Sequence, residues 1–136
     1  MAASLYIVVE GEDPGFDIYV NGRALARNEG ELEKLAMRVG VKPLLDYFSA
    51  DRDAMALLVE EGAGNEKLLE RLPQAQWYAP EDGLVTVRAL LEALRASAEL
   101  LGEDTRRVAA ELEEYERVLM KTAAHKLRWH LAVSWR

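Results

Sequence analysis

Three side chains near the two ends of the chain combine a carboxylate, a guanidinium and an imidazole. They are Glu10, Arg128 and His130. If the first and last predicted strands pair antiparallel, Glu10 comes near Arg128, and His130 lies further along the same strand as Arg128. Around a cleft, these groups could carry out general acid/base chemistry or hold an anionic ligand. The simpler interpretation is a cross-strand ion pair without a catalytic role.

The two histidines of the chain, His125 and His130, form no metal-binding pattern. Metal-binding histidines on one helix are usually about three or four positions apart, whereas these straddle a predicted helix-to-strand junction. The absence of cysteine excludes disulfides, thiolate metal sites and cysteine nucleophiles. Glycine-rich phosphate loops and the common hydrolase motifs are also missing. We therefore expect no metal and no cofactor, with His125 at a helix C-terminus and His130 on the polar face of a strand.

Acidic residues crowd the turn after the first predicted strand. They are Glu10, Glu12, Asp13 and Asp17. The alternating aspartates of a dedicated calcium loop are absent, so a solvated acidic turn is the better interpretation. Such a surface could attract a basic protein, with Asp13 and Asp17 as contact residues and Asp51 and Asp53 as additional candidates.

The net charge of −7 is unevenly distributed along the chain. Residues 1–116 carry a net charge of −12, whereas residues 117–136 carry +5. We expect the basic end to complement a helix dipole and the acidic loops of the same molecule. Because no basic stripe with interleaved aromatic residues is present, no nucleic-acid partner is expected.

The tryptophans are candidates either for the core or for contact with a partner. Trp129 lies on the apolar side of a predicted strand and should be buried. Trp77, in a predicted loop, and Trp135, near the C-terminus, could instead supply binding energy at a surface. Trp77 is thus the aromatic candidate for a binding site.

Two long helices in the C-terminal half should position these groups. Apolar residues recur at helical spacing over residues 84–101 and again over residues 108–122. Pro80 suits the start of the first helix and Gly102 its end, and residue 103 or 104 should cap the second. The two helices should form an antiparallel hairpin that buries their apolar stripes. Four glutamates are expected to lie largely on other faces of the second helix: Glu111, Glu113, Glu114 and Glu116.

The two ends of the chain have the pattern of strands. Residues 127–135 alternate apolar and polar side chains, and residues 4–10 are apolar and rich in β-branched types. We predict that they pair in one sheet, with the helix hairpin on one face. Residues 16–20 predict a further short strand, followed by Asn21-Gly22, a dipeptide typical of hairpin turns.

Shorter helices are predicted between these elements. Asn28 and Glu31 have the spacing of a capping box, and Gly40 should end the helix that they begin. Residues 44–48 predict another short helix. Further helical segments are predicted within residues 51–62 and 65–72.

Length and composition fit one α+β domain over residues 1–136. Its small, mostly antiparallel sheet should contain both termini and pack against the helix hairpin and two or three shorter helices. The N-terminus has no basic region, and its apolar run is short, so neither a signal peptide nor a membrane anchor is expected. A cytoplasmic location without membrane contact follows as the expectation.

Several segments of the chain resemble a family of small, uncharacterised bacterial proteins of about this length. The segments are Pro14-Gly15-Phe16-Asp17, Val20-Asn21-Gly22, Ala24-Leu25-Ala26, Trp77-Tyr78, Gly83-Leu84, Thr86-Val87-Arg88-Ala89-Leu90 and Arg128-Trp129-His130-Leu131-Ala132-Val133. The resemblance implies a bacterial cytosolic protein and brings no catalytic residue with it.

Two functions therefore remain open. The first is a non-catalytic acidic protein that binds a partner with a basic surface, in the manner of small antagonist or immunity proteins. The alternative is an enzyme or small-ligand-binding protein with an acid/base site around His130, Arg128 and Glu10. Self-association as a homodimer, through the sheet edge or the helix hairpin, is a third expectation to be tested.

Overall fold

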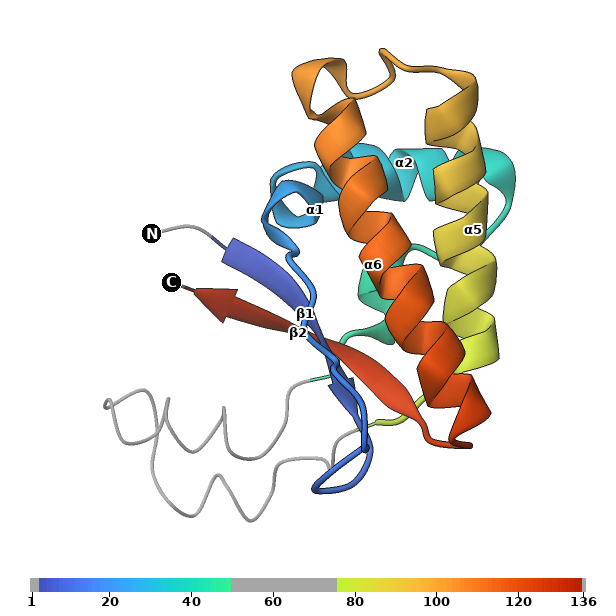
Figure 1. Cartoon of the computed structure of the whole chain (residues 1–136). Helices are drawn as coiled ribbons and strands as arrows, with labels where there is room; N and C mark the ends of the chain where they lie inside the picture. The colour runs from blue at the N-terminus through green and yellow to red at the C-terminus, as the bar shows by residue number, and fades with distance from the viewer. Residues whose placement is uncertain (1–2, 50–75, 136) are drawn as a thin grey trace, which may run out of the picture.

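Both ends of the described chain lie in one two-stranded antiparallel sheet, which packs against a long helix hairpin (Figure 1). The structure is a computed structural model that describes residues 3–49 and 76–135. The fold is α+β, as predicted. The predictions for Asp51, Asp53 and the helical segments within residues 51–72 lie outside the described residues.

The sheet consists of β1 (Ala3–Val9) and β2 (Trp129–Trp135), with Ile7 opposite Leu131 and Val9 opposite Trp129. The predicted pairing of the two termini is therefore confirmed. Alternate residues of β1, Leu5, Ile7 and Val9, are buried. They lie on the sheet face that packs on the helices, because successive side chains of a strand point to opposite faces.

The helix hairpin consists of α5 (Pro80–Ala96) and α6 (Thr105–Ala124), which lie side by side in Figure 1. Pro80 starts α5, as predicted. The predicted end at Gly102 is wrong, because α5 ends at Ala96 and Gly102 instead opens the short helix η3 (Gly102–Asp104). Ala98 is exposed, and Leu100 and Leu101 pack against the core from the segment beyond the helix rather than from a continuing helical stripe. The fully buried contacts of the hairpin come from Val87, Leu90, Leu91, Val108, Leu112, Val118 and Leu119.

Between β1 and residue 49, the described chain forms three short helical elements. They are α1 (Arg23–Arg27), α2 (Glu29–Val39) and the 3-10 helix η1 (Leu44–Tyr47). Gly40 ends α2 in the left-handed conformation, with its φ at 80°, as predicted. The capping box of Asn28 does not form; its amide instead donates to the carbonyl oxygen of Ala24 and to the Asp104 carboxylate.

The predicted strand over residues 16–20 and its hairpin turn are wrong. Residues 16–20 form no strand, and Gly22 is instead the N-cap residue of α1. Two carboxylates of α6 bind backbone N–H groups in and just after the predicted turn. Glu114 accepts the Asn21 N–H at 2.9 Å, and Glu111 accepts backbone N–H groups of α1. Long-range hydrogen bonds to α6 thus override the preference of Asn21-Gly22 for a hairpin.

Within the described residues, no helix is both long enough and apolar enough to cross a membrane. The N-terminus of the described chain and the end of β2 lie near each other in Figure 1, at the end of the sheet nearest α1.

Candidate functional site

The structure brings Glu10 and Arg128 together, as the sequence predicts. Arg128 Nη2 lies 2.5 Å from Glu10 Oε2, and Arg128 Nε lies 3.1 Å from the same oxygen. The hydrogen bond from the Arg128 side chain lowers the pKa of Glu10. The Arg128 side chain is 57% exposed and the Glu10 side chain 32% exposed, so this is a solvated ion pair.

We expect this ion pair to contribute little to stability. Because the pKa of Glu10 is lowered in the folded state, its contribution is present above pH 4.5, its ordinary pKa, and is lost as the pH falls through the folded value. Glu10→Gln should thus lower the thermal unfolding midpoint only slightly at neutral pH, and the difference from wild type should vanish in acid. Thermal unfolding at several pH values and at about 1 M salt, where the Debye length is only about 3 Å, checks this. A large loss that survives high salt would contradict it.

Among the described residues, no hydrogen bond or ion pair joins His130 to Glu10 or Arg128. His130 is 0% exposed and lies on the sheet face opposite the helix hairpin, next to Val8 of β1. His130 lies on the strand face that the alternation predicts, but this face is buried rather than polar and solvated, and the Trp77 ring lies against the imidazole with 4.8 Å between ring centroids. Nδ1 lies 3.1 Å from the Leu131 carbonyl oxygen, and Nε2 has no hydrogen-bond partner among the described residues.

The remaining candidates divide between the surface and the core. Asp13 and Asp17 are exposed, and each accepts the backbone N–H of the second residue after it at 2.9 Å. Trp77 is half-buried through its contact with His130, so it offers only part of its ring to a partner. His125 is the C-cap residue of α6, as predicted, with its ring 4.8 Å from that of Phe16.

A groove with a volume of about 880 Å³ lies between β1 and the chain that returns toward α1, and it also reaches Ser134 of β2. One wall is β1 itself, including Ile7 and Val9, and the other is the returning chain from Asp17 to Asn21. We call it the β1 groove. Its lining also includes Glu12 and Arg23.

The β1 groove combines acidic and aromatic side chains at its rim. Tyr19 is 69% exposed, which is unusual for a residue flanked by apolar positions. Glu12 and Asp17 line the end of the groove next to Val9 and are exposed, whereas Arg23 lines the end next to Leu5. Sequence patterns missed Tyr19 and Arg23 because the residues around them were assigned to a strand and turn that would have closed the groove.

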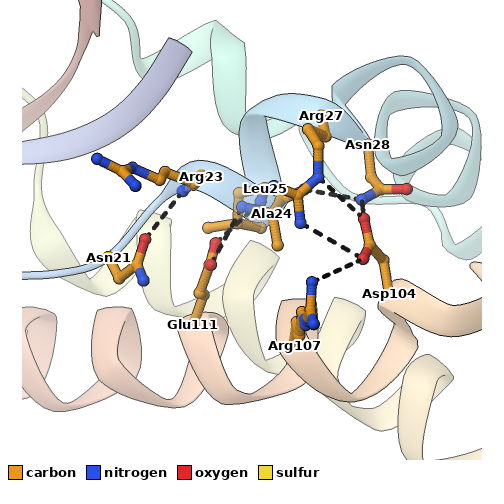
Figure 2. Close-up of polar contacts among 9 residues, drawn as sticks. All are labelled: Asn21, Arg23, Ala24, Leu25, Arg27, Asn28, Asp104, Arg107 and Glu111. Atoms are coloured by element: carbon orange, nitrogen blue, oxygen red, sulfur yellow. Dashed lines mark hydrogen bonds and ion pairs between the residues drawn. The ribbon is translucent and has the colours of Figure 1, made fainter. Parts of the chain in front are cut away.

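The far end of the β1 groove is held in place by α6 (Figure 2). Glu111 accepts the N–H groups of Ala24 and Leu25 at 3.1 and 2.9 Å, and so caps the start of α1. Glu111 is only 7% exposed, and burial raises its pKa. The prediction that it lies on an outer face of α6 is therefore wrong, although its spacing from Val108 and Tyr115 fits the buried stripe.

A second carboxylate fixes the end of α1. Asp104 accepts hydrogen bonds from the Asn28 amide at 2.9 Å and from Arg27 Nε at 3.2 Å, and Arg107 lies 4.0 Å away (Figure 2). The hydrogen bond from Asn28 and then that from Arg27 lower the pKa of Asp104. Each charged group here faces a partner within the chain, so this cluster is a structural brace between α1 and α6.

No group of three or more histidine, aspartate or glutamate side chains among residues 3–49 and 76–135 is arranged to hold a metal ion. Comparison of the chain with protein-family models, with curated proteins and with solved structures found no match. Proposals about function therefore depend on the geometry of the chain itself.

Proposed function

We propose that the protein is a non-catalytic binding protein that engages a basic protein partner through the β1 groove. The observation that carries the proposal is the exposed Tyr19 beside exposed carboxylates in a groove next to a sheet edge. Tyrosine supplies a large contact area at low cost in side-chain entropy and is frequent among the residues that dominate binding energy. We also propose that the protein is cytoplasmic, as expected from the sequence.

Electrostatics supports a basic partner. Within residues 10–17 there are four acids and no base, and among residues 3–49 and 76–135 only Glu10 of these acids forms an ion pair with a cation. Glu12, Asp13 and Asp17 are exposed around the groove. Such a patch steers oppositely charged partners and disfavours acidic ones.

The acid/base alternative receives less support from the same geometry. Glu10 and Arg128 already neutralise each other, and the imidazole of His130 is buried against Trp77. The β1 groove is lined by none of Glu10, Arg128 and His130. A substrate in that groove would therefore meet exposed carboxylates and Tyr19 rather than an acid/base pair.

The proposal is tested by reversing the charge of the groove. We expect the double variant E12K/D17K to lose at least tenfold in affinity for the natural partner, about 1.4 kcal/mol or more. The partner would be obtained by affinity capture from the source cells and then purified. Its dissociation constant would be measured by calorimetry at two salt concentrations, because binding through exposed charges weakens as salt screens them.

The matched control reverses two exposed glutamates elsewhere. E92K/E99K changes the net charge from −7 to −3, the same change as E12K/D17K, but on and beyond α5. It should bind as wild type does. If both double variants weaken binding equally, or if the captured partner binds independently of salt and of both variants, the proposed binding face is wrong.

A further inference from the structure

The outer edge of β1 presents backbone groups to the β1 groove. In an antiparallel strand, successive residues direct their N–H and C=O groups alternately to the two sides. The Glu10 N–H donates to the Arg128 carbonyl oxygen, just before β2, at 2.9 Å, whereas the Leu5 N–H donates to the Gly22 carbonyl oxygen on the other side at 3.1 Å. The odd-numbered residues of β1 therefore direct their backbone groups into the groove.

Among the described residues, the hydrogen bonds at this edge are made by its first part. Leu5 has both groups engaged, because its carbonyl oxygen accepts from the Tyr115 hydroxyl while its N–H donates to Gly22. Among the described residues, neither Ile7 nor Val9 has a hydrogen-bond partner on the groove side. Beyond the Leu5–Gly22 contact, the returning chain separates from β1 and leaves the groove between them.

The other edge of the sheet is covered differently. Phe48 forms a parallel bridge with Leu131, and Tyr78 forms an antiparallel bridge with Trp129. The Ser49 N–H also donates to the Leu131 carbonyl oxygen at 3.0 Å. Within the described residues, the edge at Ile7 and Val9 is thus the stretch of sheet edge that remains available beside a groove.

We propose that an extended, basic segment of the partner adds to this edge as a third strand. Its backbone would pair with the N–H and C=O groups of Ile7 and Val9, and its side chains would alternate between the two faces of the sheet. This inference deepens the proposed function and rests on it. The partner would bind through a single extended segment of its chain rather than through a folded surface.

The charged residues that line the groove determine which side chains the bound segment should carry. Glu12 and Asp17 lie at the Val9 end, so Lys or Arg side chains belong at that end of the bound strand. Arg23 lies at the Leu5 end and would repel a second basic group there. Between these ends, apolar side chains of the segment would contact Val8, Ile18 and Tyr19, which line the groove.

A single extended chain fits the groove better than a second copy of this protein does. The returning chain from Asp17 to Asn21 forms a wall along the same edge. Edge-to-edge pairing of two folded copies would bring two such walls together at the interface. Two copies would also bring together two molecules that each carry a net charge of −7.

The test uses peptides selected from a random seven-residue display library against the full-length protein. We expect enrichment of peptides with apolar residues and with Lys or Arg toward one end. On binding, hydrogen exchange of the Ile7 and Val9 amides should slow at least tenfold. The Val8 amide, which already faces β2, should change little and serves as the internal control.

Alternate N-methylation gives the decisive control. Two versions of the best peptide would be made, with N-methyl groups at the odd or at the even residues. Only one set of amides faces β1 in a paired strand, so one version should bind at least tenfold more weakly and the other should bind nearly unchanged. Equal effects in the two versions, or no slowing at Ile7 and Val9, would overturn the inference.

The outcomes separate this inference from the proposed function. If E12K/D17K still weakens binding of the purified partner while the two N-methylated peptides behave alike, the binding face stands and the added strand is wrong. If E12K/D17K has no effect on the partner, the proposed function fails as well. A dimer mass in solution, together with slow hydrogen exchange at Ile7 and Val9 in the absence of peptide, would contradict the inference. It would show that a second copy of the chain pairs with this edge instead of a partner segment.

Discussion

Gly22→Ala should destabilise the protein by at least about 3 kcal/mol, because the added methyl group has no room. A Cβ atom at this position would lie 1.7 Å from the Leu5 carbonyl oxygen and 2.6 Å from the Tyr115 hydroxyl oxygen. The nearer atom belongs to the backbone of β1, so a side-chain rotation cannot remove the clash. Either β1 or the start of α1 must move.

The neighbours of Gly22 leave little freedom for that movement. The Gly22 carbonyl oxygen accepts the Leu5 N–H and also the Ala26 N–H of α1. The Leu5 carbonyl oxygen is held in turn by the buried Tyr115 hydroxyl of α6. Gly22 therefore lies where β1, α1 and α6 meet, and displacing it disturbs all three contacts.

Gly30→Ala is the matched control. Gly30 lies in α2, and apart from its chain neighbours and the backbone of its own helix, a Cβ atom there would have no described heavy atom within 4 Å. The substitution should stabilise the protein by about 0.5 to 1 kcal/mol, since glycine is a poor residue inside a helix. Urea unfolding of both variants gives the two free energies of unfolding. A Gly22→Ala variant as stable as wild type would show that β1 and α1 are not in close contact.

The elements that the sequence predicted well are those with strong local patterns. The stripes of α5 and α6, the start at Pro80 and the end of α2 at Gly40 each follow from spacing or backbone preference within a short window. The pairing of β1 with β2 could also be inferred, because each of the two apolar strands needed a partner. These features gave the α+β fold and the contact of Glu10 with Arg128.

The elements that the sequence missed depend on contacts between distant residues. Asn21-Gly22 favours a hairpin locally, but Glu114 accepts a hydrogen bond from 93 positions away and Glu111 from 87 positions away. His130 follows the strand alternation, yet Trp77 covers the face that alternation assigns to solvent. The β1 groove exists only because the first of these long-range effects prevents the predicted hairpin. Its residues could therefore not be identified as a site from local patterns.

Glu111→Ala should destabilise the protein by about 2 to 4 kcal/mol. It removes the acceptor of two N–H groups in the buried residues Ala24 and Leu25, and an unsatisfied buried donor costs about 1 to 3 kcal/mol. Glu113→Ala, on the exposed side of the same helix, is the matched control and should change stability by less than about 1 kcal/mol. Urea unfolding at neutral pH measures both. Equal small effects would show that Glu111 does not cap α1.

The pH dependence of the Glu111 contribution has a definite sign. Burial raises its pKa above the ordinary value of 4.5, so the folded protein binds the proton more tightly than the unfolded chain. The free energy of unfolding decreases with rising pH wherever the folded state binds more protons than the unfolded state does. Glu111 therefore makes stability fall as the pH rises from 4.5 through the folded pKa.

Glu111→Gln isolates that effect, because glutamine keeps the shape of the side chain but cannot titrate. The difference in unfolding free energy, wild type minus Glu111→Gln, should therefore decrease as the pH rises above 4.5 and then become constant. The lowered pKa values of Glu10 and Asp104 act in the opposite direction, but they contribute equally to both proteins and cancel in the difference. A difference that increases with pH would mean that the two N–H groups of α1 stabilise the carboxylate more than burial destabilises it.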